Sequence, residues 1–170
     1  MKKQILDESD IRRSLTRITH EILEHNQGVA DIILVGIETR GIYLANRIQK
    51  NMEQVEGVCV PCIPLNVYAW RDDIEKHNDL PHLPIDVKNK KIILIDDVLF
   101  RGRTIRAAMD AIMHFGRARE IQLAVLIDRG HRELPIRADY VGKNIPSSLD
   151  EIINVKVKEI DEKDGIYIQK

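Results

Sequence analysis

The sequence lacks several features that would assign a class of protein at once. Its 170 residues contain no apolar run long enough to cross a membrane, no internal repeat and no low-complexity segment. The net charge is −1, so overall charge gives no reason to expect a nucleic-acid partner, and any basic site must be local. No apolar signal region follows Met1–Gln4, so we expect a cytoplasmic protein with no membrane partner.

Cysteine is also scarce. The two cysteines, Cys59 and Cys62, have a spacing that occurs in redox-active pairs and in halves of zinc sites. A zinc site needs a second pair of ligands, and a redox pair usually opens a helix, whereas residues 58–67 are apolar and extended in pattern. We therefore expect two small buried side chains rather than a redox or metal site.

The chain does contain alternating helix and strand patterns. Apolar residues at helical spacing predict a helix from Ile11 to Leu23, with Ser9 or Asp10 as its cap and Gly28 as its end. Two further helices are predicted, at about 42–52 and 105–115. Apolar or alternating runs predict strands at 32–37, one or two within 58–70, then 92–95, 121–127, 138–141, 152–157 and 166–168.

This alternation indicates an α/β fold, with a central parallel sheet flanked by helices. The last strands are expected to form an antiparallel edge or a small hood. Residues 71–90 are polar, contain Pro81 and Pro84, and are predicted to be a long loop. No segment has the composition of a linker, so we expect a single domain over residues 1–170.

One segment, residues 92–104, carries the chemistry. The apolar run 92–95 predicts a buried strand, Asp96 and Asp97 follow it, and a loop with Gly102 leads into an amphipathic helix. Ligands of α/β sheets bind at the carboxyl ends of strands, and such a loop with the start of its helix forms an anion site. The loop suits a phosphate and the carboxylates suit ribose hydroxyls, so the residues predict a ribose-5-phosphate pocket.

This segment resembles the diphosphoribosyl-binding signature of type I phosphoribosyltransferases. Residues 11–18, 35–43 and 128–140 extend the likeness to the PyrR family over about residues 7–170. Members of that family are pyrimidine operon attenuation regulators with uracil phosphoribosyltransferase activity. The resemblance implies a type I phosphoribosyltransferase-like fold, a homodimer or higher homo-oligomer, and three kinds of partner: phosphoribosyl diphosphate (PRPP), uridine nucleotides, and the leader mRNA of a pyrimidine operon.

The resemblance also implies a role for each matching position. Asp96 and Asp97 would hold the ribose hydroxyls, and together with Arg40 they form the implied catalytic set. The 5-phosphate would be surrounded by Arg101, Gly102, Arg103 and Thr104. The pyrophosphate, with Mg²⁺ as its companion rather than in a dedicated protein metal site, would face Thr39, Arg40 and Gly41. The loop that closes over the site would begin at Arg71, Asp72 and Asp73.

Three departures from the family pattern lie on the catalytic side. Glu38 stands beside the pyrophosphate loop, where a carboxylate repels an anion unless Mg²⁺ or Arg40 compensates. Arg101 stands where members usually have threonine, and it either adds a phosphate contact or fills space in a tight loop. Residues 74–90 are shorter than the usual closing loop. We therefore predict weak transferase activity with nucleotide binding retained; the alternative is a regulator that keeps the pocket only as a nucleotide sensor.

Two local basic segments bear on RNA binding. Residues 12–20 contain three arginines and no acid before Glu21, and residues 129–143 contain four cations and two acids. Taken alone, they would be interpreted as solvated basic faces. The resemblance implies RNA contacts by Thr16, Arg17, His20, Arg132, Arg137 and Lys143. A purine salvage transferase is the less favoured alternative, because residues 128–143 would then have no role.

Two other side chains have competing interpretations. His131 has the chemistry of a general acid, but beside Arg132 we expect it on the surface or facing RNA. Trp70 has the shape to stack on a base, and packing beneath the loop is at least as well supported.

Overall fold

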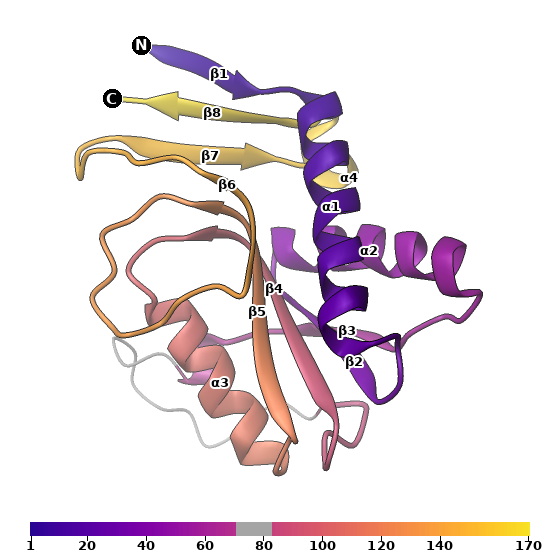
Figure 1. The fold of residues 1–170 in the computed structure, drawn as a ribbon. Helices are drawn as coiled ribbons and strands as arrows, with labels where there is room; N and C mark the ends of the chain where they lie inside the picture. Colours follow the sequence, from indigo (N-terminus) through magenta and orange to yellow (C-terminus); the bar gives the residue numbers. More distant parts are fainter. Residues whose placement is uncertain (71–82) are drawn as a thin grey trace.

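The computed structural model describes residues 1–70 and 83–170. Its centre is a five-stranded, wholly parallel sheet in the order β3-β2-β4-β5-β6 (Figure 1). The strands are β2 (Ile32–Ile37), β3 (Cys62–Leu65), β4 (Lys91–Leu99), β5 (Glu120–Asp128) and β6 (Tyr140–Asn144). Every residue of β2 is buried, as expected for a strand covered on both faces. The predicted α/β class and parallel sheet are confirmed.

Helices cover the two faces of this sheet. α1 (Glu8–Asn26) and α2 (Arg40–Glu56) pack on one face, where Ile93 and Ile95 of β4 join their core. α3 (Arg103–Phe115) packs on the other face with Ile92 and Leu94. Successive residues of β4 therefore serve opposite cores, as strand alternation requires. The short 3₁₀ helix η1 (Tyr68–Trp70) packs on α3.

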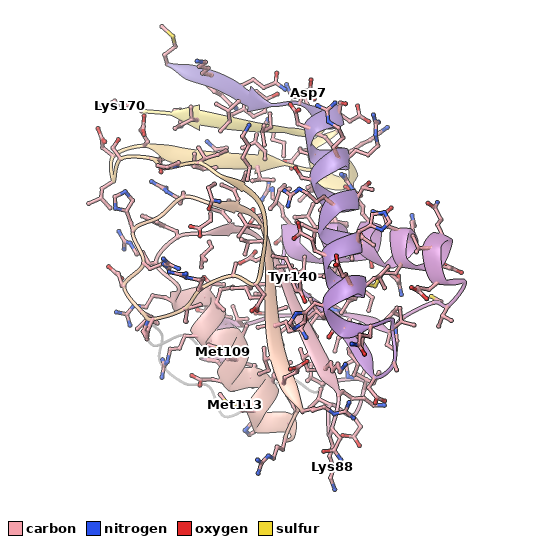
Figure 2. The ribbon with its side chains drawn as sticks, in the orientation of Figure 1. Asp7, Lys88, Met109, Met113, Tyr140 and Lys170 are labelled. Atoms are coloured by element: carbon pink, nitrogen blue, oxygen red, sulfur yellow. The ribbon has the colours of Figure 1, made fainter. Side chains whose placement is uncertain are left out.

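A buried polar network fixes α1 against the sheet. The Asn26 Nδ2 group donates to Gln122 Oε1 on β5 at 3.1 Å, and Gln122 Nε2 donates back to Asn26 Oδ1 at 2.8 Å. The Tyr140 hydroxyl of β6 donates to Gln122 Oε1 at 2.6 Å, and Figure 2 shows Tyr140 beside α1. Each buried polar group thus has a partner, which defines the position of α1.

A separate antiparallel sheet forms a hood over one end of the molecule (Figure 1). Its strands are β1 (Lys2–Leu6), β8 (Gly165–Gln169) and β7 (Ile152–Lys156), in that order, and α4 (Lys158–Asp161) connects β7 to β8. The predicted hood from the C-terminal strands is confirmed. β1 was not predicted, and it brings the chain's first residues next to its last.

Several predicted boundaries were wrong. Asp7, not Ser9 or Asp10, caps α1, and Asp10 reciprocates by accepting from the Asp7 N–H in a capping box. β4 continues through Asp96 and Asp97 to Leu99, so the two carboxylates lie in the strand rather than after it. The backbone there still pairs with β5, which a sequence pattern of apolar residues does not reveal.

The expectation for the cysteines was partly wrong, because Cys59 is exposed and Cys62 is only partly buried. Cys62 Sγ donates to Asn46 Oδ1 at 3.4 Å, and burial, with a contribution from Cys59, raises the pKa of Cys62 to about 11. The ring centroids of Trp70 and Phe115 of α3 lie 5.8 Å apart, so Trp70 packs against α3, in agreement with its interpretation as a packing residue. Among the described residues, no helix is long and apolar enough to cross a membrane.

Candidate phosphate and RNA sites

The order of the strands creates a crevice at the carboxyl ends of β2 and β4. From β2 the chain moves outward to β3 on one side, and from β4 it moves to β5 and β6 on the other. Connections that diverge in this way leave a switch point where α/β proteins bind ligands. The loop at Glu38–Thr39 leads from β2 into α2, and the loop at 100–102 leads from β4 into α3.

Two glycines let these segments approach closely. A Cβ on Gly41 would collide with the carbonyl oxygen of Ile95 in β4, and one on Gly36 would collide with the backbone of Ile42. Only glycine therefore fits at either position without moving backbone. The first turn of α2 lies directly against β4 at Ile95 and Asp96. Arg40 lines the same cavity as Asp97.

Both helices that start at this edge have open amino termini. The N-cap residues are Thr39 for α2 and Gly102 for α3, and neither cap makes a side-chain hydrogen bond to its helix among the residues described. Gly102 has φ +90°, a conformation that favours glycine. α1, which starts away from the crevice, has a complete capping box. The unused N–H groups of two helix termini at one edge make a site for anions.

The carboxylate pair is held from within the strand. Asp96 Oδ1 accepts from the Asp97 N–H at 2.9 Å, and Asp97 Oδ1 accepts from the Val98 N–H at 2.8 Å. Asp96 is only 8% exposed, and its burial, together with the charge of Asp97, raises its pKa well above the ordinary value of 3.8. The ionised pair is thus short of donors, and hydroxyl groups or a cation would stabilise it.

A cavity of about 270 Å³ opens beside Asp97. Arg40 of α2 and Asp161 of α4 also line it. The hood supplies the rest of the lining, with Lys2, Ile153, Asn154, Val155, Lys156 and Gln169. These hood residues were not predicted, because strand patterns in the sequence do not say which surface a separate sheet will cover.

Arg40 makes a two-point contact with Asp161. Its Nε lies 3.2 Å from Oδ2 and its Nη2 lies 3.0 Å from Oδ1, and Oδ2 also accepts from the Val157 N–H at 2.8 Å. Burial alone would raise the pKa of Asp161, but the Val157 N–H and Arg40 outweigh burial and hold the pKa below its ordinary value. The arginine implied for pyrophosphate therefore also fastens the hood to the loop.

The segment after β5 packs against the loop that is predicted to bind the 5-phosphate. The Glu133 N–H donates to the Arg101 carbonyl at 2.9 Å, and Glu133 Oε1 lies 3.4 Å from Arg103 Nε. Thr104 is exposed in the first turn of α3. The Arg101 guanidinium lies 5.0 Å from the centre of the Phe100 ring, so its side chain packs on that ring.

The first group of predicted RNA contacts lies on α1 and β6. Thr16, Arg17 and His20 are exposed on α1, and Lys143 is exposed on β6. Arg17 donates to the carbonyls of Val141 (3.1 Å) and Gly142, so it joins the helix to β6. Its other terminal nitrogen pairs with Glu21 at 2.8 Å.

The second group lies in the segment after β5. Arg132 and Arg137 are exposed and border a hollow of about 300 Å³, and Arg132 Nη1 donates to the Ile136 carbonyl at 3.2 Å. His131 is also exposed, as expected, and is hydrogen-bonded to the Ser147 carbonyl. Arg129 does not belong to this basic surface: it is 6% exposed and donates to Ser147, Ser148 and Glu151.

The predicted loop residues Arg71, Asp72 and Asp73 lie outside the described residues, so the site includes none of them. Across residues 1–70 and 83–170, no three His, Cys, Asp or Glu side chains gather as a group that could hold a metal ion. Glu38 is exposed, and its N–H donates to the Leu65 carbonyl of β3 at 3.0 Å.

Comparison with known proteins identifies relatives of this chain. A family model described as "Phosphoribosyl transferase domain" matches residues 1–162. A "Bifunctional protein PyrR" from Latilactobacillus sakei subsp. sakei (strain 23K) is 54% identical over 178 aligned residues, covering 100% of this chain and 99% of that protein. A protein of the same name from Halalkalibacterium halodurans is 55% identical over 177 residues, covering 100% of this chain and 98% of that protein.

Solved structures place the fold. A hypoxanthine phosphoribosyltransferase from Staphylococcus aureus has a TM-score of 0.77 at 20% identity, covering 99% of this chain and 91% of that chain. At this identity the likeness establishes the fold alone. The predicted type I phosphoribosyltransferase fold is confirmed.

Proposed function

This chain belongs to the PyrR family within the phosphoribosyl transferase domain proteins, and from that premise we propose how its described residues divide the family's two activities. It is a regulator of a pyrimidine operon with uracil phosphoribosyltransferase activity. The crevice at β2 and β4 is the proposed nucleotide site, and the exposed surface of α1, β6 and the segment after β5 is the proposed RNA surface.

In the transferase reaction, uracil displaces pyrophosphate from C1 of PRPP and gives UMP. We assign Asp96 and Asp97 to the ribose hydroxyls, the first turn of α3 to the 5-phosphate, and the first turn of α2 with Arg40 to the diphosphate. The observation that carries this assignment is the pair of helix amino termini without side-chain caps near a carboxylate pair of which Asp96 is buried and Asp97 is partly exposed. Holding the sugar rigidly between these groups supplies much of the catalysis.

Mg²⁺ would enter with the diphosphate. Its chemistry is to neutralise the leaving group, and carboxylate oxygens are ligands that it prefers. Asp97 and Asp161 line the cavity and are the carboxylates placed to approach such an ion. We propose a cation shared with the substrate rather than a dedicated protein site.

The same pocket, filled with UMP, would favour the form that binds the leader mRNA. We assign RNA contacts to Thr16, Arg17, His20, Arg132, Arg137 and Lys143, because all six are exposed and each offers a donor suited to phosphates or base edges. RNA-bound protein would promote transcription termination. We further propose that the protein acts in the cytoplasm as a homodimer or a larger homo-oligomer, which analytical ultracentrifugation tests.

The nucleotide assignment is tested by calorimetry with the Asp97→Asn variant. UMP affinity should fall because the substitution replaces one carboxylate oxygen, which accepts from a ribose hydroxyl, by an amide NH2 group. The melting temperature should stay close to that of the parent. Equal UMP affinity in a folded variant would contradict the placement of the ribose. Activity is assayed in parallel, and UMP binding without any turnover would favour the sensor-only alternative.

The RNA assignment is tested by gel shift with Arg137→Ala and Thr16→Ala. Each should cost about 1–3 kcal/mol in leader affinity if the residue makes a specific contact. Removing Arg137 should also reduce the dependence of affinity on salt concentration. Unchanged affinity in both variants would contradict the assignment of this surface.

A further inference from the structure

The hood has one apolar and one polar face. Val155 of β7 and Ile166 of β8 are buried in the core that lies beneath it. Strand pairing places Asn154 opposite Tyr167, and Lys2 opposite Gln169, two residues further along β8. Because side chains alternate along a strand, these four share the other face. That face also lines the cavity, through Lys2, Asn154, Lys156 and Gln169.

Three lysines converge on Tyr167 in this face. The ammonium nitrogens of Lys2, Lys163 and Lys156 lie 4.8, 5.3 and 6.0 Å from the centre of its ring. The ring is held against Gly165, where an added Cβ would lie 2.9 Å from its Cε2 atom. Within residues 1–70 and 83–170, none of these three ammonium groups forms an ion pair with a carboxylate.

This arrangement is electrostatically incomplete. The face of an aromatic ring attracts cations, but a single ring does not neutralise three of them, and like charges held close together repel. Lysine side chains are long enough to extend into water, so the three ammonium groups are able to turn toward a bound anion. Lys2 and Lys156 also line the cavity with Arg40, whose charge is paired with Asp161, and with Asp97.

We propose that Lys2, Lys156 and Lys163, arranged around Tyr167, form a second anion site that binds a chain of two or more phosphates. We call these three residues the hood lysine cluster. The proposal rests on the proposed function, because the cluster adjoins the Arg40 side of the cavity, to which the diphosphate is assigned. Within that function the cluster extends the side of the site that binds the leaving diphosphate. Its positive charge would offset the negative charge of Glu38.

The size and position of the site favour a small anion over RNA. A cavity of about 270 Å³ is smaller than the roughly 300–1,000 Å³ of sites for drug-sized ligands, and it suits a diphosphate. The cluster lies on the hood, whereas the residues assigned to RNA lie on α1, β6 and the segment after β5. Two sources share the required chemistry: pyrophosphate from the transferase reaction and the phosphate tail of a nucleoside triphosphate.

The test is calorimetric titration of the full chain with inorganic pyrophosphate, UMP and UTP. The variant replaces all three lysines (Lys2→Gln, Lys156→Gln and Lys163→Gln). The matched control replaces Lys3 and Lys158 by glutamine; Lys3 follows Lys2 on the opposite face of β1, and Lys158 lies outside the cluster. We expect the triple variant to raise the Kd for pyrophosphate by about tenfold or more, equivalent to about 1.4 kcal/mol, and the control to change it little.

The other arms separate the possible outcomes. If the triple variant binds pyrophosphate more weakly than the parent but binds UMP equally well, the cluster is supported. If its affinity for UTP also falls while that for UMP does not, the triphosphate tail is a second source of the bound phosphates. The triple variant should also melt at a higher temperature than the parent without ligand, because repulsion is removed. Unchanged pyrophosphate affinity with intact UMP binding would overturn the cluster alone. If the parent protein does not bind UMP at all, the proposed function is overturned instead. Weaker leader RNA binding with unchanged pyrophosphate affinity would assign the cluster to RNA and overturn the proposal.

Discussion

Asp96 is the residue whose protonation connects the fold to the site. Its side chain is buried beside a second carboxylate, and burial followed by the charge of Asp97 raises its folded-state pKa above 3.8. Its favourable contribution to stability is therefore complete below about pH 3.8 and is lost as the pH rises through the folded pKa. At neutral pH the ionised pair is a cost, as is common where stability is exchanged for function.

We predict that Asp96→Asn raises the free energy of unfolding at pH 8 by about 1–3 kcal/mol, within the usual span of single substitutions, because it removes the charge of a buried carboxylate. The gain should shrink as the pH is lowered and vanish below about pH 3.8. The variant should also lose transferase activity, because a ribose-hydroxyl acceptor is altered. Urea unfolding from pH 3.5 to pH 8 measures the effect; a variant less stable than the parent at pH 8 would show that the pair is not strained.

Gly41 is the residue that allows α2 to reach β4. We predict that Gly41→Ala costs about 2–3 kcal/mol, because the new Cβ meets the Ile95 carbonyl, a backbone atom that cannot move alone. The matched control is Gly57→Ala, which has φ +70° but no atom within 4 Å of the added Cβ. That control should cost only the left-handed strain of about 1 kcal/mol. Urea midpoints compare the two, and equal losses would refute the close-contact explanation.

At the scale of elements, two arginines on one side of α2 hold the short α4 segment. Arg40 binds Asp161, and Arg47, seven residues later, binds both Glu159 (2.9 and 2.6 Å) and Asp164 (2.8 Å for each nitrogen). Arg47 holds the pKa of Glu159 below its ordinary value. For Asp164, burial raises the pKa, but Arg47 and the Lys158 N–H outweigh it. Ion pairs to α2 thus fasten the α4 end of the hood, in addition to the apolar contacts of Val155 and Ile166 with the core.

Because these carboxyl pKa values are lowered, their contribution to stability is complete above about pH 4.5 and is lost as the pH falls through the lowered values. We predict that Arg47→Gln costs about 1–3 kcal/mol at pH 7, with the lower part of the range favoured by the partial exposure of the pair. The difference between parent and variant should decline toward pH 3. Thermal melts across this range provide the test, and a difference independent of pH would argue against the ion pairs as its source.

The junction between α1 and β6 has a similar dual role. Arg17 donates to the Val141 and Gly142 carbonyls, whereas the Thr16 hydroxyl donates within its own helix, to the Arg12 carbonyl at 2.9 Å. We predict that Arg17→Ala lowers both leader RNA affinity and the free energy of unfolding, the latter by about 1–2 kcal/mol. Thr16→Ala should lower RNA affinity while stability changes by less than about 0.5 kcal/mol. Equal stability of the two variants in urea would show that Arg17 does not join the elements.

At the scale of the whole molecule, local patterns predicted the central sheet well. Ile32–Ile37 was predicted to the residue, because an uninterrupted apolar run is typical of a strand buried on both faces. The run at 92–95 correctly indicated a buried strand, and the two carboxylates that follow it lie in the second half of β4. Those inferences needed only neighbours in the sequence.

The hood and its contacts needed information that local patterns lack. β1 contains few apolar residues, and its partner β8 lies at the other end of the chain. The Arg40–Asp161 contact joins residues 121 positions apart, and the lysines around Tyr167 come from three different segments. Arg129 was counted with the basic segment because charge is visible in a sequence and burial of a single arginine is not.

Glu38 and Arg101 are the residues whose effect on turnover we consider for the whole molecule. We propose that turnover is weak because Glu38 opposes the diphosphate; Arg101 packs on Phe100, so its bulk is a smaller obstacle than the sequence indicated. Glu38→Lys with Arg101→Thr should raise kcat/KM for PRPP about tenfold or more, since about 1.4 kcal/mol of barrier is tenfold in rate. RNA binding should be unaffected. Rapid turnover by the unmodified protein, or no gain in the double variant, would remove this explanation.

We propose that one pocket at the end of the sheet controls RNA binding on a different surface. The most direct test is leader RNA affinity, measured at fixed salt concentration with and without saturating UMP, for the parent and for Asp97→Asn. We predict that UMP tightens RNA binding by the parent. Without UMP, the variant should bind RNA as tightly as the parent does, and adding UMP should increase its RNA affinity much less. RNA affinity that is the same with and without UMP in the parent would contradict it.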